Sequence, residues 1–168
     1  MDVQSPPDVR DLTVGRVMSR TLVAVDPDES PLLAWEIMRR AGVHHLPVVD
    51  GDRHLVGVLT REDITARWSG GPAEQSRVRV HDLVSGHRCP RISAHAPLRE
   101  AAAAMIGAGT AAIPVLGESG TIVGMVTTTD VLRAVAGRIG EEAGDGEPPE
   151  LMTGMFRLVP VLPHDSWR

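Results

Sequence analysis

Apolar and polar residues follow the same order in two parts of the chain. Each part begins with a short extended stretch, at residues 21–25 and 89–93, and continues with apolar residues at helical spacing, at 30–42 and 96–109. That spacing predicts an amphipathic helix. Two apolar runs around a polar turn then predict a β-hairpin, at 46–60 and 113–127, and a second helix follows each hairpin. The predicted unit is β-α-β-β-α, present twice, which gives an α/β (α+β) fold.

The helix boundaries in these units carry their own signals. Ser30 is a good N-cap residue, Pro31 suits the first helical position, and Gly42 stops the helix. The corresponding helix of the second part is rich in alanine and is expected to end at Gly107 or Gly109.

The two parts are sequence repeats. Residues 34–63 align with 101–130 at a constant offset of 67, and ten of the thirty positions are identical. A repeat of this kind indicates duplicated structural units. The predicted organisation is an N-terminal segment at 1–9, repeat one at 10–68, a flexible linker at 69–77, repeat two at 78–140, and an acidic segment with an apolar tail at 141–168.

Each repeat carries a threonine followed three residues later by an aspartate, where the last strand meets the last helix. These pairs are Thr60 with Asp63 and Thr127 with Asp130. The plain interpretation is a capping box, in which the hydroxyl and the carboxylate satisfy the first amides of the helix. Such boxes are common, so one copy alone favours that interpretation.

Three features favour a ligand site instead. The pair recurs at the same place in both repeats, and a glycine, Gly57 or Gly124, precedes each threonine on the strand. Glycine weakens a strand unless something must approach its backbone closely. A helix N-terminus attracts phosphate, and an acid beside it accepts hydrogen bonds from a ribose diol. Hydroxyl, amides and carboxylate together predict a nucleotide site.

The paired units, the "LPVV" and "IPVL" strands and the "GVLTRED" and "GMVTTTD" endings resemble tandem CBS domains, the cystathionine-β-synthase-type regulatory module. The resemblance covers residues 10 to 138. It implies two pseudo-symmetric repeats packed sheet to sheet, with two clefts that take AMP, ADP, ATP or S-adenosylmethionine as regulatory ligand, and assembly into a homodimer.

The resemblance also assigns candidate ligand contacts residue by residue. Asp63 and Asp130 would hold ribose hydroxyls, and Thr60 and Thr127 would contact phosphate. The base would be walled by residues near Val23 and Pro90 and by the turns that contain Val43, His44, His45, Ala111 and Ala112.

The two predicted sites differ in charge. Repeat one has His44, His45 and Arg61 where repeat two has Ala111, Ala112 and Thr128. We therefore expect unequal sites, with the more anionic ligand bound where the histidines and the arginine lie. Pseudo-symmetry leaves open whether the histidines accompany Asp63 or Asp130. Surface histidines at a helix–strand turn are the plainer interpretation of His44 and His45.

Composition narrows the function classes. A net charge of −5 argues against a nucleic-acid partner. All cationic side chains are arginine, which excludes lysine chemistry, and no nucleophile has an evident base. One cysteine with scattered histidines makes a poor zinc site, so we expect no metal. The single cysteine and the absence of a signal peptide or apolar run predict a cytoplasmic protein away from membranes.

The sequence therefore predicts a non-catalytic sensor of an adenosyl ligand, with no required cofactor, that signals to a protein partner by a conformational shift. The alternative is a structural module for dimerisation or docking, in which both threonine–aspartate pairs are helix caps and no small molecule binds. An apolar stripe of Val131, Leu132 and Val135 is the candidate dimer surface.

Overall fold

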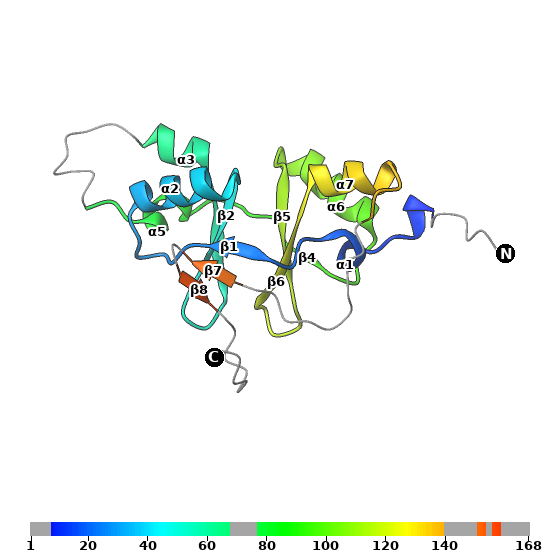
Figure 1. The fold of residues 1–168 in the computed structure, drawn as a ribbon, viewed down its shortest axis with the longest axis horizontal. Helices are drawn as coiled ribbons and strands as arrows, with labels where there is room; N and C mark the ends of the chain where they lie inside the picture. Colours follow the sequence, from blue (N-terminus) through cyan, green and yellow to red (C-terminus); the bar gives the residue numbers. More distant parts are fainter. Residues whose placement is uncertain (1–7, 68–76, 140–150, 154–155, 159–168) are drawn as a thin grey trace. The chain divides into compact units, whose positions relative to one another are not determined.

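The computed structural model describes residues 8–67 and 77–139, and the backbone of residues 151–153 and 156–158 (Figure 1). The predicted linker, apart from Arg77, and most of the predicted tail lie outside these residues. The chain divides into two compact units, one of Met1–Arg20 with Arg88–Glu147 and one of Thr21–His87 with Pro148–Arg168. We call them unit 1 and unit 2.

Unit 2 contains the predicted order of repeat one. Its elements are β1 (Leu22–Ala24), α2 (Pro31–Ala41), β2 (His45–Val49), β3 (Leu55–Thr60), α3 (Arg61–Ala66) and α5 (Val80–Val84). Strands β2 and β3 form the expected antiparallel hairpin, and Val25 joins β1 to β2 in parallel through a bridge to Val48. On its other edge β1 pairs in parallel with β7 (Leu151–Thr153), which pairs with β8 (Phe156–Leu158).

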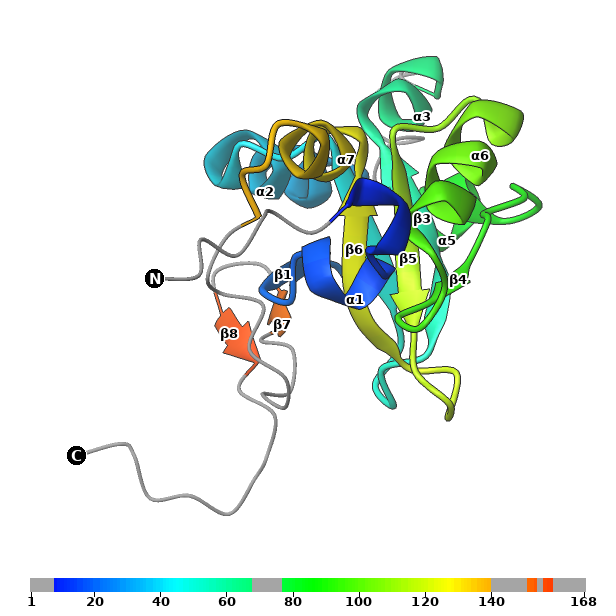
Figure 2. The ribbon, with the colours of Figure 1, turned by 90° about the vertical axis from the view of Figure 1, so that its right-hand side faces the viewer.

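Unit 1 repeats the order with the second half of the sequence. Its elements are η1 (Val9–Asp11), α1 (Val14–Val17), β4 (Ile92–Ser93), α6 (Leu98–Ala108), β5 (Ala112–Leu116), β6 (Ile122–Thr127) and α7 (Thr128–Val135). Strand β4 pairs in parallel with β5, and β5 runs antiparallel beside β6 (Figure 2). The mixed α+β fold predicted from the sequence is confirmed.

Local signals explain the helix ends. The Ser30 hydroxyl accepts from the Leu33 amide, Pro31 opens α2, and Gly42 closes it in the left-handed conformation with φ 66°. Helix α6 ends in the same way at Gly109, with φ 63°. Glycine suits these two positions because a side chain disfavours a positive φ.

Each unit has an aliphatic core. In unit 2, Met38 of α2, Leu46 and Leu59 of the hairpin and Ile64 of α3 are fully buried together. In unit 1 the corresponding core contains Leu98, Met105, Ile113 and Val126. The cores place the ends of β3 and β6, and hence both threonine–aspartate pairs, at fixed positions at the edge of each unit.

The helix at the start of each repeat packs on the sheet of the other repeat. Helix α1, from repeat one, lies beside β6 in unit 1 (Figure 2), and α5, from repeat two, lies beside β3 in unit 2. The chain crosses from one unit to the other at residues 20–21 and again at 87–88.

These crossing segments explain the two glycines that precede the threonine–aspartate pairs. A Cβ added at Gly57 would lie 2.9 Å from Cβ of Val84 on α5. One added at Gly124 would lie 2.6 Å from Sδ of Met18 and 3.0 Å from the Ser19 carbonyl oxygen. Both glycines lie at points of close approach, but the approaching group is the chain itself, so the glycines do not favour a ligand site, contrary to the prediction from the sequence.

None of the helices in residues 8–67 and 77–139 is long and apolar enough to cross a membrane.

Candidate functional site

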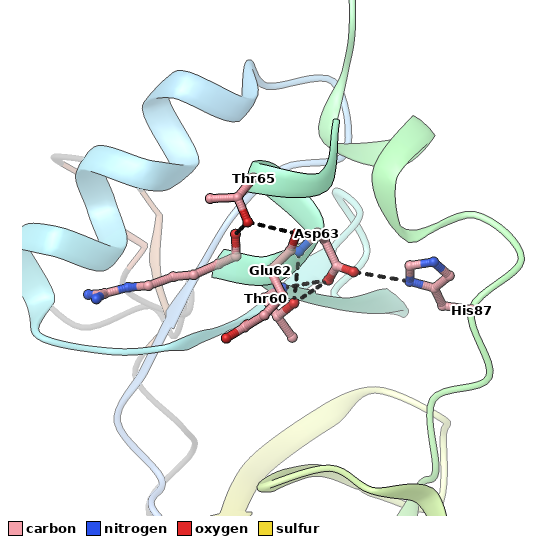
Figure 3. Close-up of polar contacts among 6 residues, drawn as sticks. Thr60, Glu62, Asp63, Thr65 and His87 are labelled. Atoms are coloured by element: carbon pink, nitrogen blue, oxygen red, sulfur yellow. Dashed lines mark hydrogen bonds and ion pairs between the residues drawn. The ribbon is translucent and has the colours of Figure 1, made fainter. Parts of the chain in front are cut away.

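The first threonine–aspartate pair forms a complete capping box at the start of α3 (Figure 3). The Thr60 amide donates to Oδ2 of Asp63 at 2.8 Å, and the Thr60 hydroxyl donates to the same oxygen at 2.6 Å. The Asp63 amide donates in return to Thr60 Oγ1 at 3.2 Å. The hydroxyl proton is therefore committed to the carboxylate, and Thr60 offers no donor to a phosphate while the box is intact.

The second pair repeats this geometry at the start of α7. The amide and hydroxyl of Thr127 both donate to Oδ2 of Asp130 at 2.8 Å, and the Asp130 amide donates to Thr127 Oγ1 at 3.3 Å. Asp130 is more buried than Asp63, with 7% of its side chain exposed against 18%.

In both boxes the two carboxylate oxygens have separate roles. Oδ2 takes both bonds of the cap, whereas the contact of Oδ1 with other described residues is a longer one to a basic side chain. That contact is 3.5 Å to Nδ1 of His87 for Asp63 and 3.8 Å to Nη1 of Arg133 for Asp130. An aspartate can therefore cap its helix and still present one acceptor oxygen outward.

The histidines of repeat one lie in the same unit as Asp63. His45 is directly opposite Thr60 in the β2–β3 ladder, and His44 is exposed in the preceding turn. Partial burial lowers the pKa of His45, although the Glu62 and Asp63 carboxylates oppose this effect. His45 is therefore mainly neutral at pH 7 and offers hydrogen bonds rather than a full charge.

Arg61 is held by contacts within unit 2. Its guanidinium lies over the Trp35 ring, 5.7 Å from the centroid, and Nη2 donates to the Val43 carbonyl at 3.4 Å. These contacts link the first turn of α3 to α2 and to the turn that precedes β2. Arg61 and Val43, both predicted site residues, are thus brought together.

In unit 1 the corresponding positions carry no charged side chain. Ala112 is opposite Thr127 in the β5–β6 ladder, in the register that His45 and Thr60 share in unit 2. Ala111 is exposed, and its carbonyl accepts from the Thr128 amide at 2.9 Å. The difference in charge predicted from the sequence therefore falls on structurally equivalent positions.

The two residues predicted to wall the base lie on extended segments. Val23 is half-buried on β1, and Pro90 is half-buried just before β4. Among the described residues, no hydrogen bond joins either residue to a capping box.

Sequence reasoning missed the two basic side chains that face the carboxylates. Arg133 was detectable, because it follows Asp130 by three residues on one helix. His87 follows Asp63 by 24 positions and comes from the segment after α5, so no local pattern connects the two.

The part of the chain that the structure describes contains no group of three or more side chains suited to hold a metal ion. Cys89 is half-buried, and burial raises the pKa of its thiol, which the nearby Arg91 partly offsets. A thiol with a raised pKa is a poor nucleophile and a poor metal ligand at neutral pH.

The similar curated proteins include one that this chain matches over most of its length and one enzyme that it matches over a small part. A CBS domain-containing protein of Dictyostelium discoideum is 28% identical over 127 residues, which are 71% of this chain and 88% of that protein. The inosine-5'-monophosphate dehydrogenase of Korarchaeum cryptofilum is 32% identical over 112 residues, but these are 67% of this chain and only 22% of the enzyme.

Solved structures with the same fold include two described as complexes. The CBS domain pair of protein MJ0100, in complex with 5'-methylthioadenosine and S-adenosyl-L-methionine, has a TM-score of 0.65 and 23% identity, and the match covers 76% of this chain and 98% of that one. CBSX2 of Arabidopsis thaliana, in complex with AMP, has a TM-score of 0.65 and 28% identity, with 74% and 96% covered.

The CBS domain family matches residues 14–70 and 80–137, one match for each repeat and together more than half of the chain. The matched part is a pair of CBS domains rather than an enzyme domain. Because the family matches both repeats, which share the same element order and the same capping box, the chain belongs to the CBS domain family.

Proposed function

We propose that the chain is a regulatory module that binds an adenosine-containing ligand through Asp63 and Asp130. The observation that carries the proposal is the division of roles within each carboxylate. Oδ2 makes both cap bonds at 2.6–2.8 Å, and within the described part of the chain Oδ1 has a single contact, at 3.5 or 3.8 Å. A ribose diol needs a charged acceptor of this kind, and charged acceptors make the stronger hydrogen bonds.

The comparisons support the class of ligand. CBSX2, 28% identical, is described with AMP, and MJ0100, which shares the fold, is described with S-adenosyl-L-methionine and 5'-methylthioadenosine. All three ligands contain adenosine. AMP, ADP, ATP and S-adenosylmethionine are therefore the candidates, with Asp63 and Asp130 as ribose acceptors and the first amides of α3 and α7 near phosphate.

The two sites are proposed to be unequal. The Asp63 site has Arg61, His44 and His45 nearby, whereas the Asp130 site has alanines and Thr128 at the same register. We expect the more anionic ligands, ADP and ATP, to prefer the Asp63 site. Bound ligand then favours one conformation of the module, by as much as its affinities for the two conformations differ, and a protein partner in the cytoplasm reads the change.

Calorimetric titration of AMP, ATP and S-adenosylmethionine tests the proposal. The variants Asp63→Asn and Asp130→Asn keep an oxygen for the cap but remove the charged outward acceptor. A charge-assisted hydrogen bond contributes about 1.5–3 kcal/mol, so each variant is expected to bind about 10- to 100-fold more weakly at its own site.

Asp82→Asn is the matched control. Asp82 also accepts from a helix N-cap amide, that of Arg79 at 2.9 Å, but it has no counterpart in the predicted ligand sites. It should leave affinity unchanged. Equal affinity in wild type, Asp63→Asn and Asp130→Asn, or no binding by the wild type, would overturn the proposal.

A specific surface supports a second function, self-association. Ile106 on α6 and Leu132 and Val135 on α7 are 84%, 68% and 63% exposed. At the offset of 67, repeat one has Arg39 and Thr65 in place of Ile106 and Leu132. Because these three exposed apolar side chains lie on the helices of repeat two, we propose a homodimer in which the apolar face that they form meets its own copy.

A further inference from the structure

His87 lies against the one oxygen of Asp63 that the capping box leaves available. It follows α5 at the end of unit 2, and its Nδ1 is 3.5 Å from Asp63 Oδ1 (Figure 3). The imidazole is 57% exposed, so it can move into solvent without disturbing the core, whereas the carboxylate is only 18% exposed and fixed by its cap.

The contact has no equivalent on the other repeat. Asp130 faces Arg133 of its own helix, and the position that corresponds to Arg133 in repeat one is Ala66. The Asp63 carboxylate is therefore contacted by an imidazole, which is a cation only when protonated, and the Asp130 carboxylate by a guanidinium, which is always charged.

Other titratable side chains lie on the elements around this contact. On α5, His81 and Asp82 lie 3.9 Å apart, and His45 on β2 has a lowered pKa. Glu62 on α3, His44 in the turn before β2 and Arg88 next to His87 in the chain are also charged or titratable. Among the described residues, Asp63 is the carboxylate with which His87 forms an ion pair.

We propose that His87 makes ligand binding at the Asp63 site depend on pH, because it competes with the ribose of the ligand for Asp63 Oδ1. The inference rests on the proposed function, since it assumes that a ribose binds there. Protonated imidazole holds the carboxylate more strongly than neutral imidazole does, because only the protonated form is a cation. Ligand binding therefore expels a proton from His87, and affinity falls as the pH falls.

The probe is adenosine, which has ribose but no phosphate that protonated His87 could attract. Binding is measured on the full chain that carries Asp130→Asn, because this substitution removes the ribose acceptor of the other proposed site and leaves the Asp63 site intact. An exposed ion pair contributes little, so adenosine is expected to bind about two- to fivefold more weakly at pH 5.5 than at pH 8. Calorimetry at pH 6.5 in two buffers of different ionisation enthalpy should show net proton release on binding.

His87→Gln in the same background should abolish the proton release and flatten the pH dependence, so that at pH 5.5 it binds adenosine more tightly than its parent. His81→Gln removes another exposed histidine, 58% exposed, that has no role in the proposed ligand site. It should retain the pH dependence of the parent.

Different results identify which idea has failed. If Asp63→Asn abolishes the remaining binding but His87→Gln keeps the pH dependence, or if protons are taken up on binding, His87 does not compete and the inference is wrong. If the Asp130→Asn protein binds no adenosine at pH 8, or binds it equally well with Asp63→Asn added, the proposed function fails and the inference with it.

Discussion

Gly57 on β3 and Val84 on α5 are in contact so close that no side chain fits between them. A Cβ at Gly57 would come within 2.9 Å of Val84 Cβ and 3.2 Å of its Cγ2. Neither atom lies at the end of a flexible side chain, so the helix itself would have to move. The contact sets how closely a helix from repeat two approaches the hairpin of repeat one.

Gly57→Ala is therefore expected to destabilise the protein. Overpacking of this kind costs about 1–3 kcal/mol, which exceeds what alanine gains over glycine in a strand. The measurement is the midpoint of urea unfolding. Gly51→Ala, in the exposed β2–β3 turn with nothing within 4 Å of the added Cβ, is the control and should unfold at the wild-type midpoint. Equal midpoints for both variants would show that α5 moves away without cost.

The capping boxes should contribute to stability whether or not a ligand binds. Thr60→Val keeps the shape of the side chain but removes the hydroxyl that accepts from the Asp63 amide and donates to Oδ2. Loss of a cap costs about 1 kcal/mol. Thr65→Val on the same helix removes a hydroxyl that donates to the Arg61 and Glu62 carbonyls and takes no part in the cap, so it should change stability by less than about 0.5 kcal/mol. Urea unfolding of both variants compares them directly.

Low pH should remove the stability that comes from the exposed cluster of Glu36, Arg39 and Arg40. Hydrogen bonds from Arg39 and then Arg40 lower the pKa of Glu36 from 4.5 to about 2. A lowered acid pKa adds stability that is fully present above the unfolded value and is lost as the pH falls through the folded value. The stability difference between wild type and Glu36→Gln should therefore shrink between pH 5 and pH 2. In 1 M salt the difference should be small at every pH, because the cluster is exposed and screened.

His45 should titrate below the ordinary range of histidine. Burial lowers its pKa from 6.5, so the folded state binds a proton less readily than the unfolded chain does. The contribution of His45 to stability is then present above about pH 6.5 and decreases as the pH falls below it. The imidazole proton shifts in NMR report the midpoint. A midpoint above 6.5 would mean that the Glu62 and Asp63 carboxylates outweigh burial.

The exposed apolar face of α6 and α7 is expected to mediate self-association. If it pairs with its own copy, Leu132→Glu buries a charge at the contact and should produce a monomer by light scattering at micromolar concentration. Leu32→Glu is the matched control, because Leu32 is similarly exposed, at 64%, but lies on α2 of unit 2. It should leave the assembly state of the wild type unchanged. A wild-type monomer, or a Leu132→Glu dimer, would remove this surface from consideration.

The sequence predicted the features that depend on residues close together along the chain. Ser30, Pro31 and Gly42 bound α2 as expected, and both capping boxes form between residues three apart. The contacts that could not be predicted join distant parts of the chain. Val84 contacts Gly57, and His87 contacts Asp63, because α5 and the segment after it pack on the other repeat. The number of residues between the partners in each pair matches no periodic pattern and no known motif. Both glycines do lie at points of close approach, but the sequence could not show that Val84 of α5 approaches one and that Met18 and Ser19, after α1, approach the other.

The crossing of α1 and α5 has a consequence for how the chain can be divided. A protein cut between residues 67 and 77 would yield two fragments that each hold a piece of the other's core, so they should remain associated as complementary partners. A single repeat produced alone would lack the helix that covers its hairpin, and would have to recruit that helix from another molecule. Tandem duplication supplies the missing helix within the same chain, at an effective concentration that no separate partner matches.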